Sequence, residues 1–152
     1  MKRVPNNRAE FHLEPLRTNN FNKMKYYIET TIETDFDSAV EKVKEELKKE
    51  GFGVLSEIDI HEKLKEKLDV DFKKYKILGA CNPPKAFEAL KAEDHIGLML
   101  PCNVVVQESS HSNNINVSAI DPVASMMAVN NAAIEPIAHE IKDKLTHVIR
   151  QL

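Results

Sequence analysis

Hydrophobic and polar positions change their period along the chain, from strand-like to helix-like. Apolar and aromatic residues alternate roughly with charged ones over residues 23–33, which predicts a first strand. From Phe36 to Leu47 the apolar residues recur every three or four positions, which predicts a helix with one buried face. Asp35 can cap the start of this helix and Gly51 can end it.

The middle of the chain repeats this change of period. We expect a strand, a short amphipathic helix, another strand and another helix at residues 52–60, 61–70, 75–81 and 83–93. Leu64 and Leu68 are predicted to lie on the inner side of the short helix. Asn82 can cap the next helix, and Pro83 suits its first turn, where a backbone N–H has no helical partner.

The last third of the chain predicts two strands and two helices. Residues 95–107 are predicted as a strand with a bulge or bend at Pro101, because proline cannot donate to the ladder. Residues 115–120 are predicted to pair with it in antiparallel fashion, and Asp121 with Pro122 begins a further helix. The final helix has an apolar stripe that comprises Ile134, Ile137, Ala138, Ile141, Leu145, Val148 and Leu152.

This order of elements predicts an α/β fold of the two-layer (α+β) kind. We expect a mixed sheet of about five strands with helices packed on one face. The length of 152 residues fits one domain, which we place at residues 24–152. Residues 1–23 show no periodic apolar pattern and are predicted to form a flexible N-terminal arm.

Composition and charge narrow the function classes. The formal net charge of −3 argues against a dedicated nucleic-acid partner, which usually meets a basic surface. No apolar run approaches the ~18 residues that a membrane span requires. The two cysteines are too few for a secreted disulfide scaffold, so we expect a soluble cytoplasmic protein with free thiols.

The two cysteines give the main candidate for a functional site. Cys81 precedes Asn82, and Cys102 precedes Asn103. A helix that crosses over the sheet between two strands makes those strands parallel. The distance that the helix carries the chain back nearly equals the distance that the next strand carries it forward to Cys102. We therefore expect both Cys-Asn pairs at the carboxyl ends of neighbouring strands, where α/β sheets tend to bind ligands.

Proximity of the cysteines leaves their role open. Cys81 lies just before a predicted helix N-terminus, where the helix dipole and free N–H groups favour a thiolate. Buried free cysteines, however, often serve only as small hydrophobic residues, and Asn82 can be only a helix cap. The candidate ligand or thiol site thus comprises Cys81, Asn82, Cys102 and Asn103, with packing as the alternative reading.

Several sequence blocks resemble the family named domain of unknown function 302. The blocks are "EIDI…LKEKLDVDFKKYKILGACNPPKAFEAL", "IGLMLPCNVVV" and a later "IDP". The resemblance implies a small two-layer α/β domain that self-associates as a dimer, and it assigns no activity. The residues that match the signature blocks are Cys81, Asn82, Pro83, Leu100, Pro101, Cys102, Asn103, Asp121 and Pro122.

The histidines and the known sequence motifs do not indicate a second functional site. His139, Asp143 and His147 follow one another at intervals of four, which is typical of a solvated helix face. His61, His95 and His111 do not pair with a cysteine in the sequence, so no metal ligands are predicted. Glycine-rich phosphate loops and the nucleophile elbow are also missing from the sequence.

Three hypotheses follow from the sequence. The favoured one is a homodimeric binding or interaction module with a small-molecule ligand site near the two cysteines. The second is a thiol-dependent redox enzyme or sensor in which Cys81 reacts and Cys102 resolves. The third is a metal-binding domain that uses the same two thiolates. The sequence indicates neither a particular cofactor nor a set of catalytic residues.

Overall fold

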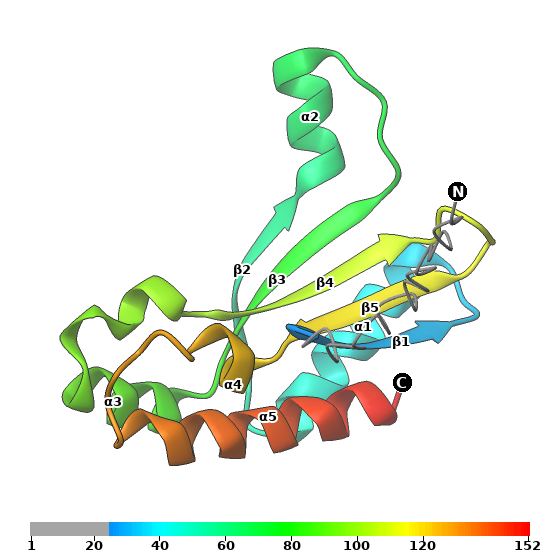
Figure 1. Cartoon of the computed structure of the whole chain (residues 1–152). Helices are drawn as coiled ribbons and strands as arrows, with labels where there is room; N and C mark the ends of the chain where they lie inside the picture. Colours follow the sequence, from blue (N-terminus) through cyan, green and yellow to red (C-terminus); the bar gives the residue numbers. More distant parts are fainter. Residues whose placement is uncertain (1–24) are drawn as a thin grey trace, which may run out of the picture.

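A computed structural model describes residues 25–152 of the chain (Figure 1). The strands are β1 (Tyr27–Ile32), β2 (Gly53–Asp59), β3 (Tyr75–Cys81), β4 (Cys102–Glu108) and β5 (Ile115–Ile120). The helices are α1 (Phe36–Lys49), α2 (Ile60–Leu68), α3 (Pro83–Ala92), η1 (Asp94–Met99), α4 (Pro122–Ser125) and α5 (Ile134–Arg150), of which η1 is a 3₁₀ helix. The predicted arm at residues 1–23 lies outside the described residues.

The five strands form one sheet in the order β1-β5-β4-β3-β2. The predicted two-layer α/β architecture with five strands is confirmed, but the sheet is antiparallel at all four strand pairings, not mixed. The predicted parallel pairing of β3 with β4 is wrong. Both α3 and η1 lie beyond the end of the sheet where β3 stops, so the chain enters β4 from that same end and runs back (Figure 1).

The predicted strand at residues 95–107 exists only in its second half. Residues 94–99 form η1, and β4 begins at Cys102, directly after Pro101. In η1 only Ile96 is buried, whereas Leu98 is exposed. An isolated apolar run therefore mimicked a strand although only one of its side chains contributes to the core.

Helices α1 and α5 cover one face of the sheet. Their predicted apolar stripes are confirmed, because the buried side chains of α1 and of the second half of α5 join those of β3, β4 and β5 in the main hydrophobic core. Ile134, at the start of α5, packs instead in a smaller cluster with Ala89 and Ile96. Asp35 caps α1 by accepting a hydrogen bond from the backbone N–H of Ser38 at 2.9 Å. Gly51 ends this helix with a φ of 82°, which glycine adopts without a steric penalty.

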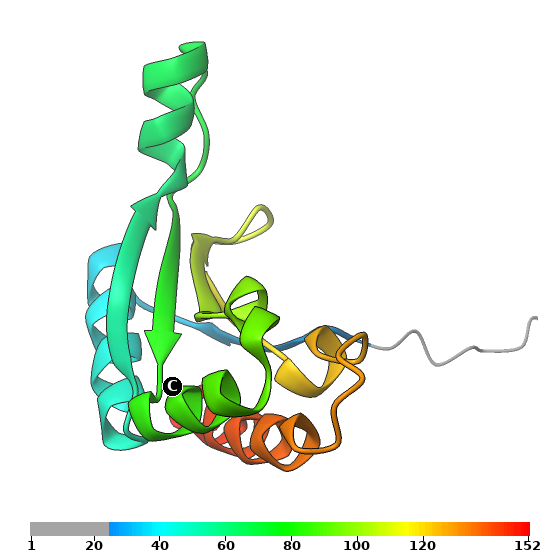
Figure 2. The ribbon, with the colours of Figure 1, turned by 90° about the vertical axis from the view of Figure 1, so that its left-hand side faces the viewer.

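Helix α2 projects away from the rest of the molecule between β2 and β3 (Figure 2). None of its residues is fully buried, but Leu64 is half-buried, so the prediction of an inward face is wrong for Leu68 and holds in part for Leu64. Leu68 is 65% exposed, and Val70 and Phe72 in the following loop are exposed as well. The short helix is amphipathic as predicted, but its apolar side is only partly covered by residues 25–152.

No helix in the described part of the chain, residues 25–152, has both the length and the apolar character needed to cross a membrane.

Candidate functional site

The two cysteines lie at neighbouring positions of adjacent strands. Ala80 of β3 pairs with Cys102 of β4, and Cys81 is the next residue along β3. Both thiols are free, with Cys102 buried and Cys81 half-buried. The cysteines thus meet as the sequence predicts, but they do so because β3 ends where the antiparallel β4 begins.

The alternation of side chains along a strand gives the two cysteines different orientations. Residues directly opposite each other in an antiparallel pair share a face, so Cys102 lies with Ala80 on the face covered by helices. Cys81 is one position further along β3, so the alternation of side chains directs it toward the other face. Since β3 ends there and the chain turns into α3, Cys81 still borders the same cavity as Cys102.

This cavity lies between the ends of β3 and β4 and helices α3 and α5. Its volume is about 30 Å³, which is room for roughly two water-sized particles. The lining is mostly apolar and consists of Phe52, Ala80, Cys81, Asn82, Lys85, Ala86, Ala89, Leu100, Cys102, Pro122, Met126, Ile137, Ala138 and Ile141. The sequence did not predict that Met126 would join the cysteines, because 23 residues lie between it and Cys102.

The surroundings of the thiols favour their protonated forms. Burial raises the pKa of the Cys81 thiol, so the predicted stabilisation of a thiolate by the nearby helix N-terminus does not prevail. Burial, together with the nearby Cys81, raises the pKa of Cys102 to about 11. At neutral pH both groups are therefore thiols, which is the opposite of an activated nucleophile.

Asn82 has the structural role that its position predicts. Its side-chain oxygen accepts a hydrogen bond from the backbone N–H of Lys85 at 3.3 Å, which caps α3. Its side-chain nitrogen donates to the backbone oxygen of Glu50 at 3.5 Å. Asn82 thus ties the end of α1 to the start of α3, and it also borders the cavity.

Asn103 lies apart from the other three candidate residues. It points away from the helix-covered face, because its neighbours Cys102 and Val104 are both buried there. Asn103 borders a groove of about 310 Å³ on the open face of the sheet. The candidate site predicted from the sequence is therefore divided between a cavity on one face and a groove on the other.

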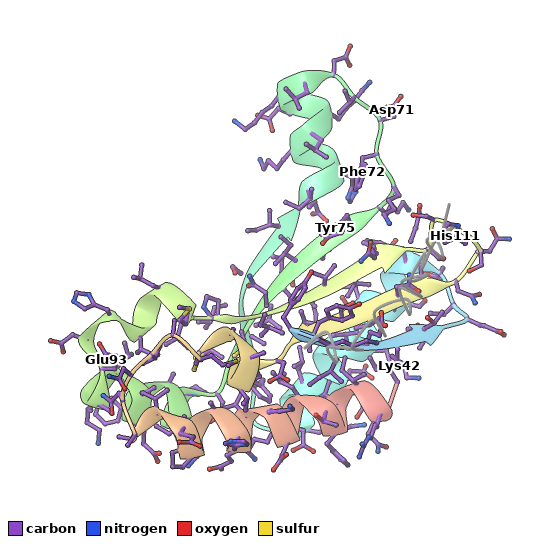
Figure 3. All side chains as sticks on the ribbon, in the orientation of Figure 1. Lys42, Asp71, Phe72, Tyr75, Glu93 and His111 are labelled. Atoms are coloured by element: carbon purple, nitrogen blue, oxygen red, sulfur yellow. The ribbon has the colours of Figure 1, made fainter. Side chains whose placement is uncertain are left out.

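The groove on the open face contains three tyrosines. Tyr26, Tyr27 and Tyr75 line it together with side chains from β4 and β5. The ring of Phe72 lies 6.2 Å from that of Tyr75, and Figure 3 shows both on the chain that descends from α2 into β3. The aromatic surface therefore continues from the groove onto the projecting arm, which we define as residues 60–72.

Sequence reasoning missed this surface. The alternation of β1, in which Tyr27 shares one face with Glu29, could have placed Tyr27 on the outer face. That Tyr75 lines the same groove as Tyr27 could not be read from the sequence, because 47 residues lie between them. It depends on the strand order.

A second groove lies beside the cavity that Cys81 and Cys102 border, which we call the thiol cavity. It has a volume of about 350 Å³ and is bordered by residues of α4, of the following loop and of α5. Met126 and Ala138 line both the cavity and this groove, so the two spaces adjoin. The exposed side chains of Met127 and His139 also border the groove.

The remaining histidines lie outside the cavity. His139, Asp143 and His147 are exposed along α5, as predicted, and His147 pairs with Glu50. His61 lies in α2 and accepts a hydrogen bond from the backbone N–H of Tyr75 at 3.0 Å. Among residues 25–152, no three histidine, cysteine, aspartate or glutamate side chains are grouped closely enough to hold a metal ion.

The fold and the site define a two-layer α/β domain with one open sheet face and a small, thiol-bordered cavity. The family model described as "Domain of unknown function DUF302" matches residues 28–152. The chain belongs to the DUF302 family.

A solved structure supports this assignment. The chain is similar to a crystal structure described as that of an uncharacterized conserved protein DUF302 from Bacillus stearothermophilus, with 29% sequence identity. The superposition has a TM-score of 0.78 and covers 84% of this chain and 98% of the other. No curated protein shows a significant match.

Proposed function

We propose that the chain is a homodimeric binding module that acts in a reducing, cytoplasmic environment and holds a small ligand in the cavity beside Cys81 and Cys102. One observation carries this proposal: the projecting arm has no buried residue in α2 and yet exposes large apolar side chains. Contiguous apolar surface of this kind is typical of an interface.

A second copy of the chain is the partner that this surface fits best. The arm and the tyrosine-lined groove lie next to each other on one molecule and are connected through Phe72 and Tyr75. A two-fold dimer uses the same patch on both copies, so the arm of each can lie in the groove of the other. Such an arrangement covers the arm and the tyrosine-lined groove of both copies at once.

The dimer leaves the thiol cavity free for a ligand. The cavity is formed on the helix-covered side of the sheet, whereas the groove lies on the open side. Its small volume and apolar lining favour a ligand of few atoms. The raised pKa of each thiol gives the redox-enzyme alternative no comparable support, because a reactive cysteine requires a stabilised thiolate.

Substitution of Leu68 in the arm tests the dimer. We expect Leu68→Glu to weaken self-association by at least about tenfold, because a charge would be buried in the interface. Monomer stability should change by no more than about 0.5 kcal/mol, since Leu68 is 65% exposed. The measurement is the mass in solution by light scattering over a dilution series.

Leu98→Glu is the matched control. Leu98 is also exposed, but it lies in η1 and not in the arm. We expect this variant to dimerise like the wild type. A wild-type chain that is monomeric throughout the series, or a Leu68→Glu variant that dimerises normally, would overturn the proposed interface.

A further inference from the structure

Three sulfur-containing side chains border the thiol cavity. Cys81 and Cys102 come from adjacent strands, and Met126 follows α4. Most of the other lining residues are apolar. A cavity with room for only about two water-sized particles and with sulfur as its main donor atom suits a single soft ion better than an organic molecule.

The donor set distinguishes between metals. Zinc in structural sites takes four ligands from cysteine, histidine or carboxylate groups, and the described residues contain no group of even three. Thiolate and thioether ligands select copper(I), which also accepts two or three ligands. Two cysteines and one methionine match copper(I) and do not match zinc.

The surroundings can accept the charge of such a complex. One copper(I) ion and two thiolates carry one net negative charge. Only the cap residue Asn82 separates Cys81 from α3, whose N-terminal dipole favours negative charge nearby, although burial outweighs this effect in the metal-free thiol. Lys85 of α3 also borders the cavity, although its ammonium group forms ion pairs with Glu140 at 2.7 Å and Glu88 at 3.4 Å.

A surface groove adjoins the cavity. Met126 borders both the cavity and the adjoining groove of about 350 Å³. Met127, which is 65% exposed, and the exposed His139 border the outer groove. A thioether and an imidazole, which are both ligands of soft metal ions, therefore lie on the surface beside the cavity.

We propose that the cavity binds one copper(I) ion through the Cys81 and Cys102 thiolates and the Met126 thioether. This inference rests on the ligand site of the proposed function and names its ligand. Binding forms two copper–thiolate bonds and one copper–thioether bond, and copper(I) gives up the ligands that held it in solution. Two S–H bonds break, so two protons are released to solvent. The metal stays copper(I), and no electrons are exchanged.

The test is an anaerobic titration of the reduced full-length chain with copper(I) against the chelator bathocuproine disulfonate. We expect one ion per chain. Cys81→Ala and Cys102→Ala should each weaken binding by at least about 100-fold, and Met126→Leu by about tenfold, since even outer-shell changes cost a metal site 10–100-fold.

Met127→Leu is the matched control, because Met127 borders the outer groove and not the cavity. Its equilibrium affinity should equal that of the wild type. Thermal unfolding of each metal-free variant shows whether it folds, and Met126→Leu keeps the test valid if a cysteine variant does not fold.

Failure of the wild type to compete for copper(I), or unchanged affinity in both cysteine variants, would overturn the copper site. The dimer assay separates this result from the proposed function. A wild-type dimer that binds no copper(I) refutes the metal and leaves the module intact, whereas a monomer that binds copper(I) refutes the dimer alone.

Discussion

At the scale of single residues, the candidate site depends on side chains that are already engaged in the fold. Asn82 caps α3 and contacts the end of α1, and Asp121 caps α4. The helix caps were predictable from the sequence because an oxygen-bearing side chain precedes proline at both positions. The different faces of Asn82 and Asn103 were not, since they follow from the strand pairing.

Asp121 is the buried charged residue of the described chain, and its pKa links stability to pH. Burial by itself would raise the pKa of this carboxyl group. Hydrogen bonds from Lys142 at 2.8 Å and from the backbone N–H groups of Ala124 and Val123 outweigh burial and lower the pKa. A lowered pKa in the folded state stabilises the protein above the unfolded value of 3.8, and this contribution is lost as the pH falls through the folded value.

We expect Asp121→Asn to reduce the free energy of unfolding by about 1–2 kcal/mol at pH 7, because it removes a buried charge-assisted hydrogen bond. The deficit should shrink below about pH 4, where the wild-type carboxyl also becomes protonated. Urea denaturation at several pH values measures this. The control is Asp143→Asn on the exposed face of α5, and a deficit of the same size at every pH would contradict the assigned role.

At the scale of elements, periodicity predicted the helices better than the connections. The stripes of α1 and α5 could be predicted because each faces one continuous core. The pairing of β3 with β4 could not, because it depends on where α3 and η1 lie beyond the sheet end and not on any local pattern. The projection of α2 could not be predicted either, because an amphipathic pattern does not show whether the apolar face packs against the same chain or another one.

Close packing at one glycine fixes the junction of β2, β3 and the segment before β4. A β-carbon added to Gly79 would lie 2.3 Å from the Oγ of Ser56 and 2.8 Å from the Cγ of Pro101. Both distances are shorter than real contacts, so the side chain of Ser56 would have to rotate and the ring of Pro101 would have to shift. A β-carbon added to Gly53, in the neighbouring strand, would meet no atom within 4 Å.

Gly79→Ala should therefore lower the free energy of unfolding by about 1–3 kcal/mol, which is the usual cost of overpacking. Gly53→Ala should change it by no more than about 0.5 kcal/mol and serves as the matched control. Chemical denaturation of both variants measures the difference. Equal stabilities would show that Ser56 and Pro101 can move aside without cost and that this packing does not constrain the junction.

At the scale of the whole molecule, two surfaces have different tasks. The open sheet face and the arm expose aromatic and aliphatic side chains, and we assign them to self-association. The opposite side holds the core and the thiol cavity, which we assign to the ligand. The sequence predicted a dimer only through its family resemblance, because the tyrosines and the arm become one surface only after folding.

A native mass spectrum of the freshly purified 152-residue chain is the direct test of the homodimer. We predict a species of twice the 17.3 kDa chain mass, and any bound copper would add its own mass to each chain. A spectrum that contains only the mass of a single chain would contradict it.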